Sequence, residues 1–246
     1  MLYRALLYVH IFLFSFSVHS SPIYHIQTED FAPYAYELPN GEIDGMALDI
    51  VQWMMNDLGI DSEIMMLPWA RAVHNTRTKN WNVLFSVART PEREDWFQWV
   101  GPFYSDEILL FRKKAIGKPA PSPATIKQSG LVLVTRDYPE EKILTQQGYK
   151  NLAYTTNPSI SLKMLLGNRA DYLALGKAAL PCLLAKDKIK SDMVESTGIS
   201  IHSTELYIAM SKNTPTSEVL RWQNSLDKLK ASPSYEKFIN ETRHCQ

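Results

Sequence analysis

The sequence has little cysteine and no excess of charge of either sign. Only Cys182 and Cys245 occur among 246 residues, which is too few for a disulfide scaffold, and their separation fits no metal site. Basic and acidic side chains number 26 each, so a nucleic-acid or anionic-membrane surface is not expected. The chain also lacks the nucleophile-elbow, zinc-protease and phosphate-loop motifs. We therefore expect no metal, no cofactor and no nucleic-acid partner.

A long hydrophobic run is missing as well. The apolar stretch at residues 5–16 is shorter than the roughly 20 residues that span a bilayer. It follows the basic Arg4, and Val18 and Ser20 stand three and one residues before a possible cleavage point. This layout is typical of a secretory signal peptide, so we expect residues 1–20 to be removed and the protein to reach the periplasm. A permanent membrane anchor is the alternative.

Export to the periplasm affects whether the two cysteines, Cys182 and Cys245, form a disulfide. In an oxidising compartment they can be joined, and closing a loop of that length contributes about 4 kcal/mol in the chain-entropy model. Two buried free thiols are the alternative.

The hydrophobic pattern alternates between short apolar runs and amphipathic segments, twice along the chain. The first round predicts strands at residues 23–27, 64–67, 83–87 and 108–112, and helices at 46–58 and from Pro68. Gly101 and Pro102 are expected to interrupt the segment 96–104, and the Lys- and Pro-rich segment 113–124 to be a surface connection. The second round predicts strands at 131–135, 152–154, 172–175 and 206–210, and helices at 139–147, 160–167, 217–229 and 234–239. The pattern predicts an α/β protein with two lobes.

A series of short motifs follows this alternation in a characteristic order. They are Phe31-Ala32-Pro33-Tyr34, Gly41, Gly45 and Asp49-Ile50, then Leu67-Pro68-Trp69, Thr90-Pro91-Glu92-Arg93, Pro102-Phe103-Tyr104, residues 167–171 and residues 207–212. Together they resemble the type II periplasmic solute-binding proteins of family 3, typified by the polar amino acid receptors of ABC importers. The resemblance implies a ligand cleft between a first lobe of residues 22–104 and 213–246 and a second lobe of residues 105–212. It also implies a hinge near residues 104–107.

The resemblance implies a ligand site in the first lobe. Arg93 would pair with a ligand carboxylate, because a guanidinium can donate to two oxygens at once. Phe31 would form one wall, and Tyr34, Trp69 and Ser86 are further candidates. A surface ion pair of Arg93 with a neighbouring acid, and packing roles for Phe31 and Trp69, are the alternatives.

In the second lobe, free backbone amides at the helix start before Pro139 would favour an anion, with Arg136 and Tyr138 as candidate ligand residues. A second polar loop lies at residues 157–159. The family's amino acid receptors carry an aspartate at the position of Gly176, which is followed here by Lys177. A ligand ammonium would then lack its carboxylate, so an ordinary α-amino acid is not expected, and Lys177 would favour an anion. Ala88 likewise stands where a hydroxyl is common.

These residues predict a monomeric binding protein that closes on a small polar, carboxylate-bearing solute and passes it to an ABC permease or a membrane sensor. Two alternatives stay open. The first is an enzyme on the same fold, similar to cyclohexadienyl dehydratase, with Glu29, Asp30 and Glu107 as the nominated cleft-side carboxylates. The second is a signalling interaction module with a vestigial cleft.

Overall fold

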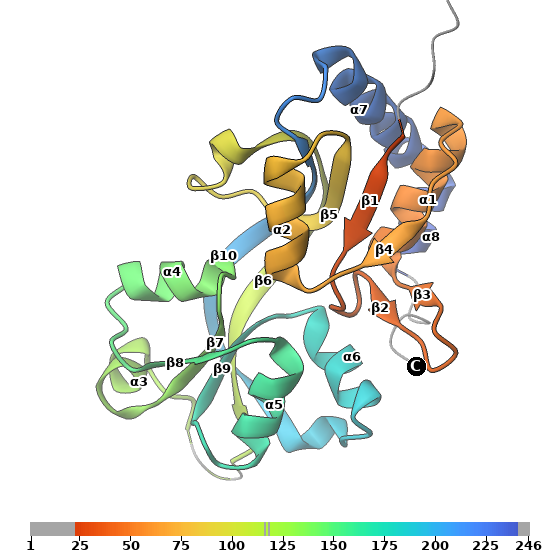
Figure 1. Ribbon diagram of the computed structural model, residues 1–246. Helices are drawn as coiled ribbons and strands as arrows, with labels where there is room; N and C mark the ends of the chain where they lie inside the picture. Colours follow the sequence, from red (N-terminus) through yellow and green to blue (C-terminus); the bar gives the residue numbers. More distant parts are fainter. Residues whose placement is uncertain (1–22, 116, 118, 241–246) are drawn as a thin grey trace, which may run out of the picture.

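The computed structural model describes residues 23–115, 117 and 119–240, in which one mixed sheet of eight strands runs through both halves of the molecule (Figure 1). The strand order is β4-β1-β5-β10-β6-β9-β7-β8. These strands are β1 (His25–Thr28), β4 (Ile64–Met66), β5 (Asn82–Ala88), β6 (Phe97–Lys113), β7 (Val132–Thr135), β8 (Leu152–Thr155), β9 (Tyr172–Gly176) and β10 (Val194–Ser211). Strands β2 (Tyr36–Glu37) and β3 (Ile43–Asp44) form a separate antiparallel pair. The predicted α/β class is confirmed.

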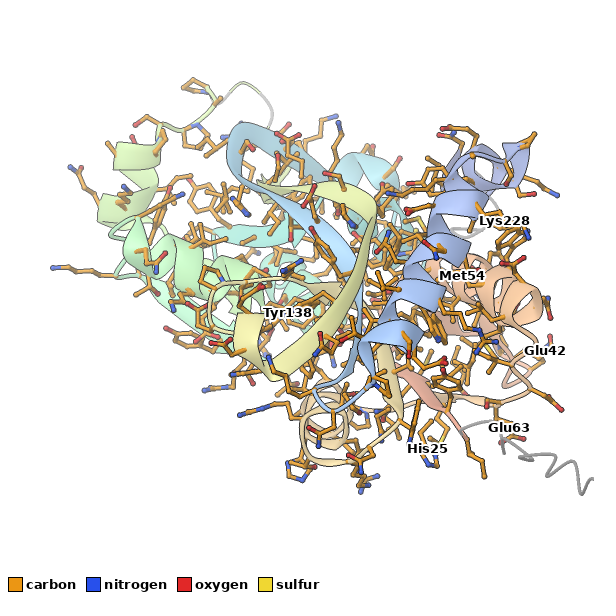
Figure 2. The ribbon with its side chains drawn as sticks, turned by 90° about the horizontal axis from the view of Figure 1, so that it is seen from above. His25, Glu42, Met54, Glu63, Tyr138 and Lys228 are labelled. Carbon is orange, nitrogen blue, oxygen red and sulfur yellow. The ribbon has the colours of Figure 1, made fainter. Side chains whose placement is uncertain are left out.

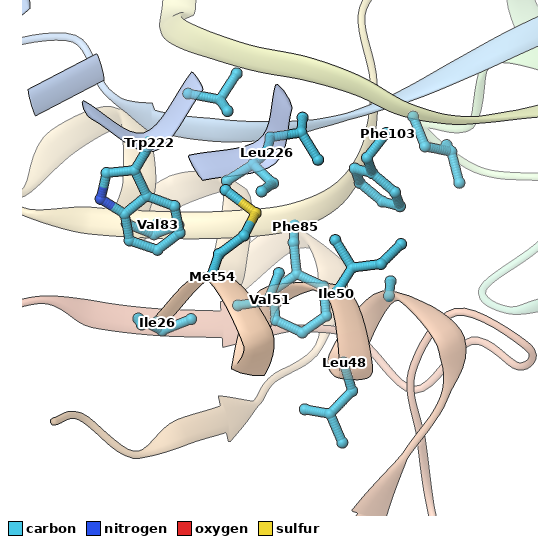
Figure 3. Close-up of a cluster of buried hydrophobic side chains, with 14 of the residues drawn as sticks. Ile26, Leu48, Ile50, Val51, Met54, Val83, Phe85, Phe103, Trp222 and Leu226 are labelled. Carbon is cyan, nitrogen blue, oxygen red and sulfur yellow. The ribbon is translucent and has the colours of Figure 1, made fainter. Parts of the chain in front are cut away.

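The first lobe consists of β1 to β5 with four helices and the first part of β6. These helices are α1 (Met46–Leu58), α2 (Trp69–Thr78), α7 (Thr216–Lys230) and α8 (Pro233–Asn240), and the 3-10 turn η1 (Glu94–Trp96) precedes β6. Alternate residues of β5 point to opposite faces, so Val83 and Phe85 pack under α1 and α7, and Leu84 packs under α2. Figure 3 shows the larger core, where Trp222 and Leu226 of α7 meet Met54 and Val51 of α1. This packing joins the end of the chain to its first helix.

The second lobe consists of β7, β8, β9 and the distal parts of β6 and β10, covered by helices on both faces. The helices are α3 (Pro123–Ser129), α4 (Pro139–Gln146), α5 (Pro158–Leu166) and α6 (Ala179–Lys186), with a 3-10 turn η2 (Ser191–Met193) before β10. Val132 and Val134 of β7 pack toward α3 and α4, whereas Leu133 packs toward α5 and α6. Helices α3 and α6 were not predicted, and α3 occupies the end of the expected surface connection.

The two long central strands join the lobes. β6 and β10 pair antiparallel over most of their length, and the predicted hinge at residues 104–107 lies within β6 (Figure 1). The expected interruption at Gly101 and Pro102 is wrong, because β6 continues through both residues. Gly101 adopts a φ of 136°, open to glycine and strained for other residues, and the register shifts opposite it between Leu206 and Ile208. The strand therefore bends there and does not end.

Three expectations concern the ends of the chain and its cysteines. The predicted signal peptide and Cys245 lie outside the described residues. Cys182 is bonded in a disulfide, so a free thiol at that position is excluded. Within the described ranges, no helix combines the length and apolar character needed to cross a bilayer.

Candidate functional site

A pocket lies between the lobes, against the central strands β6 and β10. It encloses about 530 Å³ and is lined by residues of both lobes. Those residues are Glu29, Phe31, Tyr34, Trp69, Ser86, Ala88, Arg93, Asp106, Ile108, Tyr138, Pro139, Glu140, Leu175, Gly176, Thr204 and Leu206. In Figure 2, Tyr138 lies on the side of the second lobe, and Lys228, Glu42 and Glu63 lie on the opposite side of the molecule. The 530 Å³ include space that is open to solvent, and the part that the centres of water-sized molecules can occupy is about 60 Å³.

Six of the eight predicted ligand residues line this pocket. They are Phe31, Tyr34, Trp69, Ser86, Arg93 and Tyr138. Arg136 is exposed and stacks at 5.4 Å from the ring of Tyr154, away from the pocket. Lys177 is exposed as well and is not part of the lining. The structure therefore brings the first-lobe candidates together with Tyr138 and separates them from Arg136 and Lys177.

Arg93 is held inside the pocket and is not a surface residue. Its side chain is buried, with the residue 7% exposed, and its guanidinium carbon lies 5.0 Å from the centre of the Trp69 ring. Nη1 donates to the carbonyl oxygen of Ala88 at 3.0 Å, and Nη2 donates to that of Asp137 at 2.5 Å. Of the five N–H donors of an arginine, these bonds to described residues use two.

The alternative of a surface ion pair between Arg93 and a neighbouring acid is not what the structure shows. Glu92 pairs with Lys142, and Glu94 pairs with Arg89. Burial lowers the pKa of Arg93, whereas the nearby Glu29 opposes that change. Arg93 therefore acts as the fixed positive charge of the pocket.

Ser86 presents an unpartnered hydroxyl to the pocket. Its Oγ is buried and has no hydrogen-bond partner among the described residues. The backbone φ of Ser86 is 66°, a left-handed conformation that is uncommon in a strand and that often marks functional positions. β5 shifts register against β10 in the same region. This irregularity lets a side chain of a buried strand face the lobe boundary.

Aromatic rings form the walls around these polar groups. Phe31 lies 5.3 Å from Tyr34 and 5.6 Å from Tyr138, and Tyr138 lies 6.0 Å from Trp69, measured between ring centres. The rings come from both lobes, because Tyr138 precedes α4. Their tilted and edge-on contacts are the favourable geometry for aromatic pairs.

Three carboxylates line the pocket, and sequence reasoning nominated only one of them. Glu29 is in the lining, but Asp30 is exposed in an ion pair with Lys186, and Glu107 is not a lining residue. Asp106 and Glu140, neither of which was nominated, are buried at 7% and 4% exposure. Asp106 lies inside the predicted hinge at residues 104–107. Glu140 lies two residues after the predicted ligand residue Tyr138. Their positions in the sequence could therefore have suggested both carboxylates as pocket residues.

The expectation drawn from Gly176 is overturned by Asp106. A Cβ atom on Gly176 would collide with Oδ2 of Asp106, and it would lie 3.5 Å from the hydroxyl of Tyr34. A carboxylate thus occupies the space that a side chain at position 176 would fill. It accepts a hydrogen bond from the Tyr34 hydroxyl at 2.6 Å and from the amides of Glu107 at 2.8 Å and Ala178 at 3.3 Å. The inference that an amino acid ligand would lack a partner for its ammonium group therefore loses its basis.

Some of the amides at the second-lobe helix starts, where an anion was expected, are bonded to the protein's own side chains. The amide of Asp137 donates to Oε2 of Glu141 at 2.8 Å, and Glu140 interacts with the Thr135 backbone. At α5, the side chain of Asn157 accepts from the amide of Ile160 at 3.0 Å. The protein's own side chains therefore use amides that an anionic ligand would need.

Burial raises the pKa of all three pocket carboxylates. The pKa of Glu29 is about 7, because burial outweighs the hydrogen bond from Tyr138 and the charge of Arg93. The pKa of Glu140 is about 8, again through burial, with Glu29 adding repulsion. The pKa of Asp106 is raised by burial and partly lowered by its bond to Tyr34. Near neutral pH the pocket therefore holds carboxyl groups that exchange protons.

Direct contacts join the lobes around the pocket. The Tyr138 hydroxyl donates to Oε2 of Glu29 at 2.7 Å, and Arg93 donates to the Asp137 carbonyl. The ion pairs Lys186 with Asp30, at 2.9 Å, and Lys142 with Glu92 lie further out. These contacts describe a closed arrangement of the lobes. No cluster of His, Cys, Asp and Glu in the described part of the chain could hold a metal ion.

Two α/β lobes that share two central strands and enclose a small-molecule pocket define the class of two-lobed solute-binding proteins. The sequence model for bacterial extracellular solute-binding proteins, family 3, matches residues 25–241, and the chain belongs to this family. The predicted family is thereby confirmed. A search of curated proteins found no match.

Solved structures share the fold. A histidine kinase sensor domain, described as similar to periplasmic binding proteins, has 17% identity and a TM-score of 0.79 over 88% of this chain and 94% of its own. An ancestral arginine-binding protein bound to arginine has 17% identity and a TM-score of 0.76 over 87% and 95%. An arginine-, lysine-, histidine-binding protein of Geobacillus stearothermophilus has 16% identity and a TM-score of 0.76 over 88% and 93%. At these identities the likeness concerns the fold alone.

Proposed function

We propose that this protein binds a small, carboxylate-bearing solute between its lobes and releases it unchanged. The observation that carries the proposal is that one pocket holds a buried guanidinium, only two of whose five donors bond to described residues, and a buried hydroxyl with no partner among those residues. A buried polar group without a hydrogen bond costs about 1–3 kcal/mol. A ligand carboxylate between Arg93 and Ser86 would remove this cost and neutralise the buried positive charge.

Closure of the lobes is the means of binding in this proposal. The ligand would enter when the lobes are apart, and the bond from Tyr138 to Glu29 and the outer ion pairs would form as they close. The differential contacts of the closed state then give the ligand its affinity.

The partner is proposed to be an ABC permease or a membrane sensor, with the protein acting as a monomer in the periplasm. The family match supports the extracellular setting, and the likeness to a kinase sensor domain keeps the sensor alternative open. An enzymatic role has less support, because the matching family is one of solute-binding proteins.

Thermal-shift screening of residues 21–246 against a library of small carboxylates and amines tests the proposal. Hits are measured by calorimetry, and the solute is analysed by NMR after incubation. We expect binding without consumption. Turnover of a hit would support the enzyme alternative, and no hit in the library would support the vestigial cleft.

Arg93 and Ser86 provide the residue-level test. Arg93→Ala should weaken a carboxylate ligand at least 30-fold, because the ligand loses a charge-assisted bond in a buried site, and Ser86→Ala should weaken it less. Arg221→Ala is the control, because Arg221 pairs with Glu218 on α7, does not line the pocket and should leave the affinity unchanged. An affinity that survives Arg93→Ala would remove Arg93 from the site.

A further inference from the structure

The charged residues of the pocket do not balance. Among its lining residues, Glu29, Asp106 and Glu140 are acidic, and Arg93 is the one basic residue. Further out, the ion pairs of Lys186 with Asp30 and of Lys142 with Glu92 each match one base with one acid, so they do not alter this excess of acids. If Arg93 pairs with a ligand carboxylate, three carboxyl groups still face the rest of the ligand.

The hydrogen bonds within the pocket show the same asymmetry. The hydroxyls of Tyr34 and Tyr138 both donate to carboxylates, at 2.6 Å and 2.7 Å, and are therefore not free to donate to a ligand. The carboxylates of Glu29, Asp106 and Glu140 retain lone pairs, since each carboxylate accepts about four hydrogen bonds. Away from Arg93 and Ser86, the pocket with its carboxylates ionised offers acceptors and needs donors.

The pocket walls also favour a cation. Phe31, Tyr34, Trp69 and Tyr138 line the pocket together with the acidic groups. A positively charged nitrogen is attracted by such rings by about 0.5–2 kcal/mol, more when it is desolvated. An anion gains nothing from ring faces, and a neutral solute gains less than a cation.

Resting on the function proposed above, we propose that the solute carries a net positive charge, with its cationic nitrogen groups held by Asp106 and Glu140 and its binding coupled to release of protons from the pocket. Asp106 reaches into the pocket from the hinge strand β6, in the space left by Gly176. Glu140 reaches in from the start of α4 in the second lobe. A cation between them joins the hinge to the moving lobe.

Proton release follows from the surroundings of Glu29 and Glu140. With pKa values of about 7 and about 8, both groups are partly protonated near neutral pH. The ionisable groups that act on the pair are Arg93, which lowers both pKa values, Tyr138, whose hydrogen bond lowers that of Glu29, and Asp30, which raises that of Glu29. A bound cation favours the ionised carboxylates, so the protons leave as it binds.

Matched pairs of solutes separate charge from shape. We would compare L-arginine with L-citrulline, and L-lysine with L-norleucine, each pair having similar length and differing by one positive charge. L-glutamate serves as an anionic probe, and agmatine as a cation without a carboxylate. We expect the cationic member of a pair to bind at least tenfold more tightly than its neutral partner, and L-glutamate not to bind.

Calorimetry in phosphate and in Tris measures the proton release, because the two buffers differ in ionisation enthalpy. At pH 7 we expect on the order of one proton released per cation bound, and an affinity that rises between pH 6 and pH 8. Proton uptake, or an affinity independent of pH, would overturn the coupling.

Isosteric variants assign the selectivity to residues. Asp106→Asn and Glu140→Gln should each weaken cation binding at least tenfold, and Glu140→Gln should reduce the number of protons released. Glu107→Gln is the matched control, since Glu107 neighbours Asp106 on β6 and does not line the pocket. Circular dichroism of each variant reports whether it is folded.

The outcomes separate this inference from the proposed function. Tight binding of a neutral or anionic solute that depends on Arg93 would keep the proposed function and overturn the net positive charge. Equal binding of cationic and neutral partners would overturn it as well. If no solute of either library binds, the proposed function fails and the present inference fails with it.

Discussion

Glu140→Gln is expected to stabilise the ligand-free protein at neutral and alkaline pH. Glu140 is 4% exposed, and burial raises its pKa from 4.5 to about 8. Glutamine has nearly the same shape and retains one oxygen that can accept the backbone hydrogen bonds, but it cannot ionise. The variant therefore removes a buried acid and keeps its packing.

The sign and size of the expected change in stability follow from the ordinary pKa of a glutamate, 4.5, and from the pKa of Glu140 in the folded protein, about 8. A carboxyl group with a raised folded-state pKa binds more protons in the folded state than in the unfolded state, so its contribution to stability falls as pH rises above about 4.5 and levels off above about 8. At pH 7.5 the loss is about 4 kcal/mol, from three pH units at 1.36 kcal/mol each. The proposed opening of the empty lobes would hydrate the carboxylate and reduce this loss, so we expect Glu140→Gln to stabilise by about 2 kcal/mol at pH 7.5.

Urea unfolding, followed by circular dichroism at several pH values between 5 and 8.5, measures the difference. The two proteins should be nearly equal in stability at pH 5, and the variant should gain steadily as pH rises. A variant that is less stable than the wild type at pH 8, or that shows the same difference at every pH, would refute the reasoning. A gain in the stability of Glu140→Gln that grows with pH would indicate that the protein retains a destabilising carboxylate for ligand binding.

Other changes probe the remaining parts of the molecule. Cys182→Ser breaks the disulfide and should lower the free energy of unfolding by about 4 kcal/mol in the chain-entropy model. Equal melting temperatures of the wild type with and without reductant would contradict this prediction. Trp222→Ala empties the centre of the first-lobe core, where Trp222 is 0% exposed, and should cost about 3–5 kcal/mol in urea unfolding, so a loss below about 1 kcal/mol would not fit. Tyr138→Phe removes the bond across the lobes to Glu29 and should speed ligand dissociation in stopped-flow measurements; an unchanged rate would separate this bond from closure.

Much of the fold was predictable because local patterns record it directly. Helix α1 occupies the predicted residues 46–58, since its apolar spacing is helical and Gly59, with a φ of 64°, ends it. The buried strand β5 was predicted at residues 83–87 from a run that is apolar except for Ser86. Helix α6 was missed, and the strand β10 was predicted at only its last third, because residues 194–205 alternate too weakly to stand out before pairing with β6.

The sequence by itself determined the fold class, the family and the first-lobe residues Phe31, Tyr34, Trp69, Ser86 and Arg93 that line the pocket. These features depend on short-range patterns and on the order of motifs along the chain, and both can be recognised in the sequence alone. Only the tertiary structure decided the charge of the pocket. Asp106, Glu140 and Gly176 lie on three separate elements, and whether a carboxylate fills the space beside Gly176 depends on how β6 and β9 pair and not on the residue at that position.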